Sequence, residues 1–169
     1  HAEHGGKGWA LRRGFALARQ RGWRWAITMD ADGQHAPADL PGFFDAIAAG
    51  QGDIVLGNRM QHTETMPWLR RLTNFSTSWV ISRLAGQRLP DVQSGYRAIR
   101  LAILDAFPLV TGNFDTESEI LLRASWAGFR VVAVPIQTIY HGEESHISKR
   151  RDTLRFLRLI RAARRWRRG

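Results

Sequence analysis

The chain has 169 residues, a formal net charge of +10 and no cysteine. The length fits one domain, and the lack of cysteine excludes disulfide frameworks, zinc–thiolate sites and thiol catalysis. No run of apolar residues approaches the ~20 that a membrane span needs. The charge is uneven, since residues 149–169 hold ten of the 25 basic residues and only one of the 15 acidic residues. The rest of the chain is therefore nearly neutral.

The chain begins with a helical pattern followed by an extended one. Leu11, Phe15 and Ala18 recur at helical spacing and predict a helix that ends at Gly22. The mainly apolar residues 24–29 then predict a strand.

The same alternation continues from residue 37 onwards. Pro37 opens a second predicted helix, which runs to Gly50, because proline is tolerated in a first helical turn. Residues 53–57 form a short apolar run that is typical of a parallel strand buried on both faces. The remaining predictions are a polar loop at 61–65, a helix at 67–85, a loop and strand at 91–99, a helix at 116–127 and a strand at 130–136. Pro135 places this last strand at a sheet edge or at its own end. Alternating strands and helices predict an α/β layered domain.

Residues 152–168 predict a strongly amphipathic helix. Its apolar positions are Phe156, Leu159, Ile160, Ala163 and Trp166, and arginines occupy the other side. This composition is typical of a helix that lies on an anionic membrane. One alternative is a helix that docks on the domain with its arginines solvated. Nucleic-acid binding is a third option, which the neutral body of the chain disfavours.

Two carboxylates, Asp30 and Asp32, follow the first predicted strand with one residue between them. In an extended chain residues i and i+2 point to the same side, so we expect both carboxylates to converge just past a sheet edge. Carboxylates that close repel each other unless a cation lies between them. Because Mg²⁺ and Mn²⁺ prefer oxygen ligands and often bind substrate phosphates as well, the pair predicts a divalent-cation site. A solvated Asp-x-Asp-Gly turn is the alternative.

Two other interpretations of this segment can be compared with the sequence. A calcium-binding EF-hand loop starting at Asp30 needs Gly at its sixth position and Glu at its twelfth, where the chain has His35 and Pro41. That interpretation fails. The aspartyl-phosphate phosphatases have a strand ending in Asp-x-Asp-Gly-Thr, with the first Asp as nucleophile. Here Gln34 replaces the Thr, so a phosphatase remains a minor alternative.

Seven short motifs follow one another along the chain. They are Gly6-Lys7-Gly8 with Gly14, Asp30-Ala31-Asp32-Gly33-Gln34-His35, Gly57-Asn58-Arg59, Met66-Pro67 with Arg70, Arg71 and Asn74, Asp91-Val92-Gln93-Ser94-Gly95-Tyr96-Arg97, Phe114 with Glu117 and Glu119, and Val134-Pro135-Ile136 with Tyr140 and Ser145. In this order they resemble the family 2 glycosyltransferases, and within them the dolichyl- and polyprenyl-phosphate mannosyl- and glucosyltransferase branch. The motif from Asp91 to Arg97 is the most specific of the seven.

The resemblance implies a GT-A-like (Rossmann-like) α/β layered domain with a mixed, mainly parallel sheet. It also implies an enzyme that transfers a sugar, with inversion, from GDP-mannose or UDP-glucose to a polyprenyl or dolichyl phosphate. Asp32 and Gln34, with Asp30, would hold Mg²⁺ or Mn²⁺ against the diphosphate of the donor. The cation would offset the charge that builds on the leaving group.

The same resemblance implies further site residues. Arg59 and Arg70 or Arg71 are candidates for clamping phosphate oxygens, because a guanidinium group fits their geometry. Asp91 occupies the position most often discussed as a base, but a phosphate monoester is already largely ionised near pH 7, so we expect Asp91 to orient other groups. The candidate donor- or acceptor-binding residues are Lys7, Ser94, Arg97, Glu117, Glu119, Ser145 and Lys149.

Three of these positions carry a more specific expectation. Glu117 and Glu119 are two residues apart and cannot share one helical face. We therefore expect one of them to point into the site and the other to be a favourable charge at the helix N-terminus. We expect His35 to form hydrogen bonds within its loop rather than to bind a metal.

The chain departs from the family pattern at its start. The family begins with a strand, a helix and a second strand that carry base and ribose contacts, and this first βαβ unit is lacking here. We therefore expect a fragment, with a catalytic domain over residues 1–148 that misses its N-terminal part and a basic amphipathic helix over residues 149–169. The expected location is cytoplasmic and peripheral, on an anionic membrane surface. A non-catalytic membrane-surface binding module and the phosphatase are the alternative functions.

Overall fold

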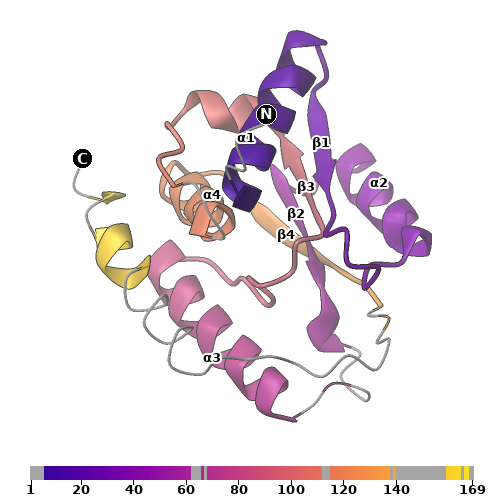
Figure 1. Cartoon of the computed structure of the whole chain (residues 1–169), viewed down its shortest axis with the longest axis vertical. Helices are drawn as coiled ribbons and strands as arrows, with labels where there is room; N and C mark the ends of the chain where they lie inside the picture. The colour runs from indigo at the N-terminus through magenta and orange to yellow at the C-terminus, as the bar shows by residue number, and fades with distance from the viewer. Residues whose placement is uncertain are drawn as a thin grey trace.

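The computed structural model describes residues 6–61, 66, 68–111, 115–137, 139, 159–164 and 166–167. These residues form a four-stranded sheet with helices on both faces (Figure 1). The strands are β1 (Trp25–Thr28), β2 (Ile54–Asn58), β3 (Arg97–Arg100) and β4 (Val131–Pro135), and the helices are α1 (Gly6–Gln20), α2 (Leu40–Ala48), α3 (Trp68–Ala85) and α4 (Asp115–Trp126). Short 3-10 helices cover Pro37–Asp39, Arg59–Gln61 and Leu101–Asp105. The predicted α/β alternation is confirmed.

The sheet has the strand order β1-β3-β2-β4 and is mixed, as expected. β1, β2 and β4 run in one direction, but β3 runs against them between β1 and β2, so only the β2–β4 pairing is parallel. The expectation of mainly parallel strands therefore holds for strand direction and not for the hydrogen-bonded pairs. Thr28 and Leu56 are both in register with Arg97. The ends of β1 and β2 thus lie beside the start of β3.

The central strand β2 divides the core into two layers. All five of its residues are buried. Ile54 and Leu56 face the larger cluster, which includes side chains of α1, α3 and α4, and Val55 packs with Phe43 of α2 on the other face. Because alternate strand residues point to opposite faces, a strand covered on both sides must be apolar throughout. Each fully buried aliphatic or aromatic side chain contributes about 1.5–3 kcal/mol.

The two edges of this sheet differ in their exposure. β4 forms one edge, where Pro135 is tolerated although it has no amide hydrogen to donate, as its sequence position predicted. β1 forms the other edge, and its four residues are all only partly buried.

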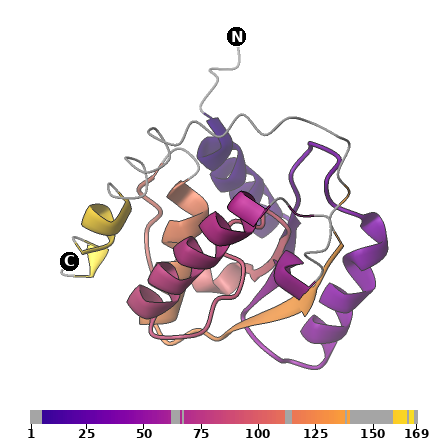
Figure 2. The same ribbon diagram turned by 90° about the horizontal axis from the view of Figure 1, so that it is seen from below.

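The described residues of the C-terminal segment pack against the domain (Figure 2). Leu159 and Ala163 are 6% and 1% exposed and share a core with side chains of α3 and α4. Trp166 packs on the same core, and the Arg123 guanidinium lies 5.4 Å from its ring centre. The expected membrane-facing stripe is therefore wrong at Leu159 and Ala163, because the domain itself covers them. The division at residue 148 stays a prediction.

None of the helices in the described part of the chain is both long and apolar enough to cross a membrane.

Candidate active site

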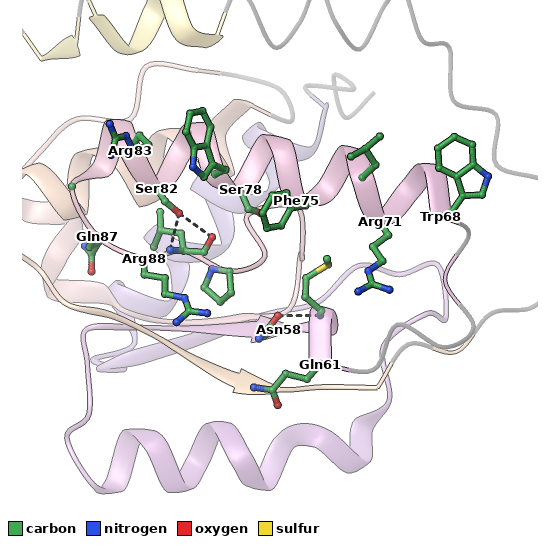
Figure 3. Close-up of a pocket in the computed structure, with 16 residues that line it drawn as sticks. Asn58, Gln61, Trp68, Arg71, Phe75, Ser78, Ser82, Arg83, Gln87 and Arg88 are labelled. Atoms are coloured by element: carbon green, nitrogen blue, oxygen red, sulfur yellow. Dashed lines mark hydrogen bonds between the residues drawn. The ribbon is translucent and has the colours of Figure 1, made fainter.

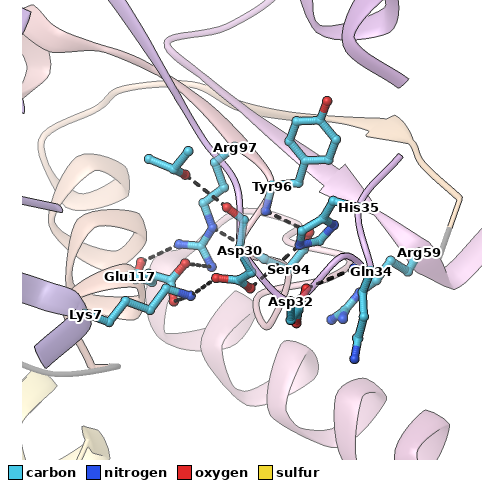
Figure 4. Close-up of polar contacts among 12 residues, drawn as sticks. Lys7, Asp30, Asp32, Gln34, His35, Arg59, Ser94, Tyr96, Arg97 and Glu117 are labelled. Atoms are coloured by element: carbon cyan, nitrogen blue, oxygen red, sulfur yellow. Dashed lines mark hydrogen bonds and ion pairs between the residues drawn. The ribbon is translucent and has the colours of Figure 1, made fainter. Parts of the chain in front are cut away.

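Three segments meet where β1 and β2 end and β3 begins (Figure 4). The loop after β1 carries residues 30–35, the end of β2 leads into Arg59, and the loop before β3 carries residues 91–96. The antiparallel insertion of β3 causes this meeting, since it brings the start of one strand to the ends of two others. Most of the candidate residues that the structure describes lie in or beside these segments.

Asp91 and Arg59 form a buried ion pair. Asp91 is fully buried, and the Arg59 side chain is 12% exposed. Arg59 donates from Nε to Oδ2 at 2.7 Å and from Nη2 to Oδ1 at 2.9 Å, and its backbone amide donates to Oδ2 at 3.1 Å. Both carboxylate oxygens of Asp91 are therefore occupied by one guanidinium fork. This geometry fits the expectation that Asp91 orients another group.

Arg97 fixes the backbone of the loop before β3. Its side chain is 1% exposed and donates to three carbonyl oxygens, those of Ser94 and Val92 at 2.7 Å and that of Glu117 at 2.8 Å. Ser94 is also fully buried. Both side chains shape the loop, and both are buried. Direct ligand binding by Arg97 or Ser94 stays a prediction.

Lys7 joins two carboxylates from distant parts of the chain. Its Nζ contacts Asp30 Oδ1 and lies 2.9 Å from Glu117 Oε2. His35 Nε2 lies 3.6 Å from the other oxygen of Asp30, and the His35 side chain is 3% exposed. The sequence indicated Lys7, Asp30 and Glu117 as separate ligand-binding candidates, and their mutual contacts were not foreseen. Nothing local could have shown them, because Lys7 and Asp30 are 23 residues apart.

We call Lys7, Asp30, Glu117 and His35 the Lys7 cluster. Their contacts shift the pKa values of two of these groups. The nearby His35 and the Lys7 ammonium lower the pKa of the Asp30 carboxyl well below its usual range, although its partial burial acts against them. Burial alone would lower the pKa of Lys7, but the contacts with Asp30 and Glu117 outweigh it and raise that pKa. Both groups are therefore held in their charged forms.

The Lys7 cluster predicts a specific dependence of stability on pH. Because the folded-state pKa of Asp30 is depressed, its contribution to stability is complete above the unfolded pKa of about 3.9 and is lost as the pH falls below it. Lys7→Met removes one cause of this shift. We therefore expect the free energy of unfolding of this variant to fall less steeply as the pH is lowered, which gives a flatter acid limb of the stability curve. Urea unfolding between about pH 7 and about pH 3 measures this limb. Arg13→Met removes an exposed cation from the same helix and should leave the limb unchanged. Parallel limbs for Lys7→Met and the unmodified chain would contradict the expectation.

Asp32 and Gln34 are the oxygen donors that remain for a divalent cation. Asp32 is exposed. Its Oδ1 accepts a hydrogen bond from the backbone N–H of Gln34, with an N···O distance of 3.0 Å, across the turn that contains Gly33. A carboxylate and a side-chain amide suit Mg²⁺ or Mn²⁺, which take oxygen ligands and keep positions open for phosphate. In the described part of the chain, no group of three or more Cys, His, Asp or Glu side chains is placed to hold a metal.

Asp30 has partners of its own, Lys7 and His35. β1 ends at Thr28, so the two-residue period of a strand no longer applies at Asp30 and Asp32. Figure 4 shows Asp30 with Lys7 and Glu117 on one side, and Asp32 with Gln34 and Arg59 on the other. The convergence of the two carboxylates on one cation and metal binding by Asp30 both stay predictions.

The structure distinguishes Glu117 from Glu119. Glu117 contacts Lys7, whereas Glu119 is fully buried. Glu119 accepts hydrogen bonds from the backbone N–H groups of Val110 and Thr111 at 2.9–3.2 Å. Arg123 also donates to Glu119, at 2.8 Å. The expectation that one glutamate points into the site is met by Glu117. Glu119 instead anchors the loop before α4, so a simple helix-terminus charge does not describe it.

Two further candidates lie on α3, and two more are not described by the structure. Arg70 and Arg71 are both on α3, where Arg70 is partly buried and Arg71 is exposed. Ser145 and Lys149 fall outside the described residues. The ligand-binding roles of all four stay predictions.

Comparison with known proteins identifies the family. The glycosyl transferase family 2 model matches residues 1–108. The chain is 37% identical over 138 residues to a polyprenol monophosphomannose synthase of Mycolicibacterium smegmatis, which covers 78% of this chain and 51% of that protein. It is 32% identical over 145 residues to a UDP-N-acetylglucosamine--dolichyl-phosphate N-acetylglucosaminyltransferase of Methanococcus voltae, with 83% and 58% covered.

A third relative is the undecaprenyl-phosphate mannosyltransferase of Micrococcus luteus, 31% identical over 137 residues, with 78% of this chain and 56% of that protein covered. The chain thus spans a little over half the length of these curated relatives. The ordered motifs, the mixed α/β sheet and these matches lead to one conclusion: the chain belongs to glycosyl transferase family 2.

Proposed function

We propose that the protein to which this chain belongs transfers a sugar, with inversion, from a nucleotide-sugar donor to a polyprenyl or dolichyl phosphate. The relatives named above are polyprenyl- or dolichyl-phosphate sugar transferases. The observation that carries the proposal is the Asp91–Arg59 pair, which holds a guanidinium group beside the loop of Asp32 and Gln34. A diphosphate is bound by guanidinium groups and by a divalent cation, and the cation in turn needs oxygen ligands such as those of Asp32 and Gln34.

In this proposal Asp32 and Gln34 hold Mg²⁺ or Mn²⁺ against the diphosphate of the donor. The bound cation supplies Lewis-acid stabilisation of the leaving nucleotide. GDP-mannose, UDP-glucose and UDP-N-acetylglucosamine are the donors to compare. Lys7, which is itself paired with Glu117, holds Asp30 at the start of this loop, and its role is to position Asp30.

Arg59 and Arg71 are the proposed contacts for phosphate oxygens. Asp91 fixes the orientation of Arg59, and this accounts for the need for a carboxylate without a proton transfer. An acceptor phosphate monoester is already largely ionised near pH 7 and can attack without a base. Ser145 and Lys149 are proposed to meet the acceptor phosphate from the C-terminal side.

Donor binding tests the proposal directly. Isothermal titration of each of the three nucleotide sugars, with Mn²⁺ and with EDTA, measures the contribution of the cation to affinity. We expect Asp32→Ala to lower the Mn²⁺-dependent affinity by about tenfold or more, since even indirect disturbance of a metal ligand has about that effect. Asp45→Ala removes an exposed carboxylate on α2 and should change nothing. Equal affinity with Mn²⁺ and with EDTA would contradict the metal assignment, and hydrolysis of a phosphate ester that depends on Asp30 would favour the phosphatase.

A further inference from the structure

One face of α3 exposes four large apolar side chains. Trp68, Leu72, Phe75 and Trp79 are 75%, 55%, 63% and 58% exposed. Their spacing places them on one side of the helix, along most of its length. Single exposed apolar residues are ordinary, but a continuous row of this size marks a contact surface for a partner or a membrane.

The orientation of α3 is fixed by polar contacts beside the exposed row. Ser78 Oγ accepts the Val92 amide at 3.1 Å, and Ser82 Oγ accepts the Leu89 amide at 2.9 Å. Asn74 and Ser78 are buried at 2% and 4% exposure. The helix therefore buries Asn74, Ser78 and Ile81 against the domain and leaves the four large apolar residues of the row exposed. Rotating α3 to bury the apolar row would remove these hydrogen bonds.

The exposed row borders an open groove of about 1100 Å³ (Figure 3). α3 forms one side of this groove, and Asn58, Met60, Gln61 and residues 86–90 form the other. Arg71, Arg83 and Arg88 lie among its lining residues. The Arg83 guanidinium is 5.9 Å from the ring centre of Trp79, so positive charge stands directly beside the aromatic row.

We propose that the α3 face, defined by Trp68, Leu72, Phe75 and Trp79 with Arg71 and Arg83, docks on the surface of an anionic phospholipid bilayer. Charge complementarity selects this occupant, because arginines beside an apolar row match anionic headgroups above acyl chains. Tryptophan is also favoured at the boundary between headgroups and hydrocarbon, and the row has one toward each end of the helix. The same face begins beside the turn that follows Arg59, so docking would bring the candidate site to the lipid surface.

This assignment differs from the one that the sequence suggested. The amphipathic C-terminal segment was expected to contact the membrane, but Leu159 and Ala163 are buried in the core. On α3, by contrast, the large apolar side chains of the row are exposed. The basic residues of 149–169 would still attract the chain to anionic vesicles, so a test must locate the contact as well as detect binding.

A single reporter on α3 locates the contact. The chain has no cysteine, so Phe75→Cys provides one site for an environment-sensitive fluorophore, and Trp23→Cys provides a control site with 64% exposure in the loop before β1. The vesicles are phosphatidylcholine alone or phosphatidylcholine with phosphatidylglycerol, without donor or polyprenyl phosphate. We expect a blue shift of the emission at position 75 and none at position 23, and only with the anionic vesicles. A failure of the transfer proposal would leave this result unchanged.

Co-sedimentation gives a second, label-free measurement. We expect the triple variant Trp68→Ser, Phe75→Ser, Trp79→Ser to bind anionic vesicles at least about tenfold more weakly, since burial of one aromatic side chain is worth about that factor. The double variant Trp23→Ser, Phe44→Ser removes exposed aromatic side chains elsewhere and should bind as before. Equal loss in both variants, equal shifts at both labels, or binding without a shift at position 75 would overturn the proposal. A blue shift at position 75 that appears without vesicles when the protein concentration is raised would assign the face to a second copy of the chain instead.

Discussion

Alanine in place of Asp91 is expected to lower the free energy of unfolding by about 3–5 kcal/mol, the usual result when one partner of a buried ion pair is removed. Asp91 is fully buried and accepts three hydrogen bonds from Arg59. Without the carboxylate, a mostly buried guanidinium and a backbone N–H would lose three hydrogen bonds to this acceptor. Urea denaturation followed by circular dichroism measures the loss. Donor affinity should fall as well, because the orientation of Arg59 is no longer fixed.

The ion pair between Arg19 and Asp105 provides the matched control. Its side chains are 45% and 59% exposed, so Asp105→Ala should cost no more than about 1 kcal/mol. An Asp91→Ala variant as stable as Asp105→Ala would refute the positioning role. An Asp91→Asn variant with normal stability and donor affinity but no sugar transfer would identify Asp91 as a base instead.

Alanine at Gly95 is expected to displace the Asp30 carboxylate and to destabilise the fold by about 1–3 kcal/mol, the usual cost of overpacking. A Cβ atom at Gly95 would overlap the Asp30 carboxylate, which Lys7 holds from another side. The loop has little freedom to move away, since the Gly95 carbonyl accepts a hydrogen bond from Thr28 Oγ1 at 3.0 Å. Since Asp30 would be displaced from its partners, the acid limb of the stability curve should flatten, as we expect for Lys7→Met.

Gly57→Ala separates general overpacking from this specific effect. A Cβ atom there would lie 2.8 Å from Ile136 Cδ1 and 3.0 Å from the Tyr96 carbonyl oxygen. This variant should also lose stability, but its acid limb should keep the slope of the unmodified chain, because Asp30 is not touched. If Gly95→Ala kept that slope too, the proposed link between Gly95 and Asp30 would be wrong.

The elements of the fold were predictable because their signals are local. The helical spacing of Leu11, Phe15 and Ala18 gave α1, and the apolar run at 53–57 gave a strand covered on both faces. Pro135 indicated the edge position of β4 without any knowledge of the other strands. These features depend on residue type and period alone, and both can be read along the chain.

The contacts between elements were not predictable in the same way. Lys7 meets Asp30 only after α1 packs beside β1. Glu117 rather than Glu119 contacts Lys7, and this depends on how α4 is oriented about its own axis in the fold. Amphipathic spacing shows that a helix has an apolar side, but it does not show what covers that side. The C-terminal segment and α3 illustrate this limit, since the domain covers the first and leaves the second exposed.

The loop before β3 keeps its shape through its backbone, and this has a consequence for how the protein can change. Arg97 binds three main-chain carbonyl oxygens, and six of the seven residues from Asp91 to Arg97 are buried. Gln93 is the exception, exposed at the tip with its amide 3.3 Å from Thr77 Oγ1. Variation at this position would alter the surface that the loop presents and leave its scaffold intact. Position 93 is therefore where selection, or a designed library, could change ligand preference at the lowest risk to folding.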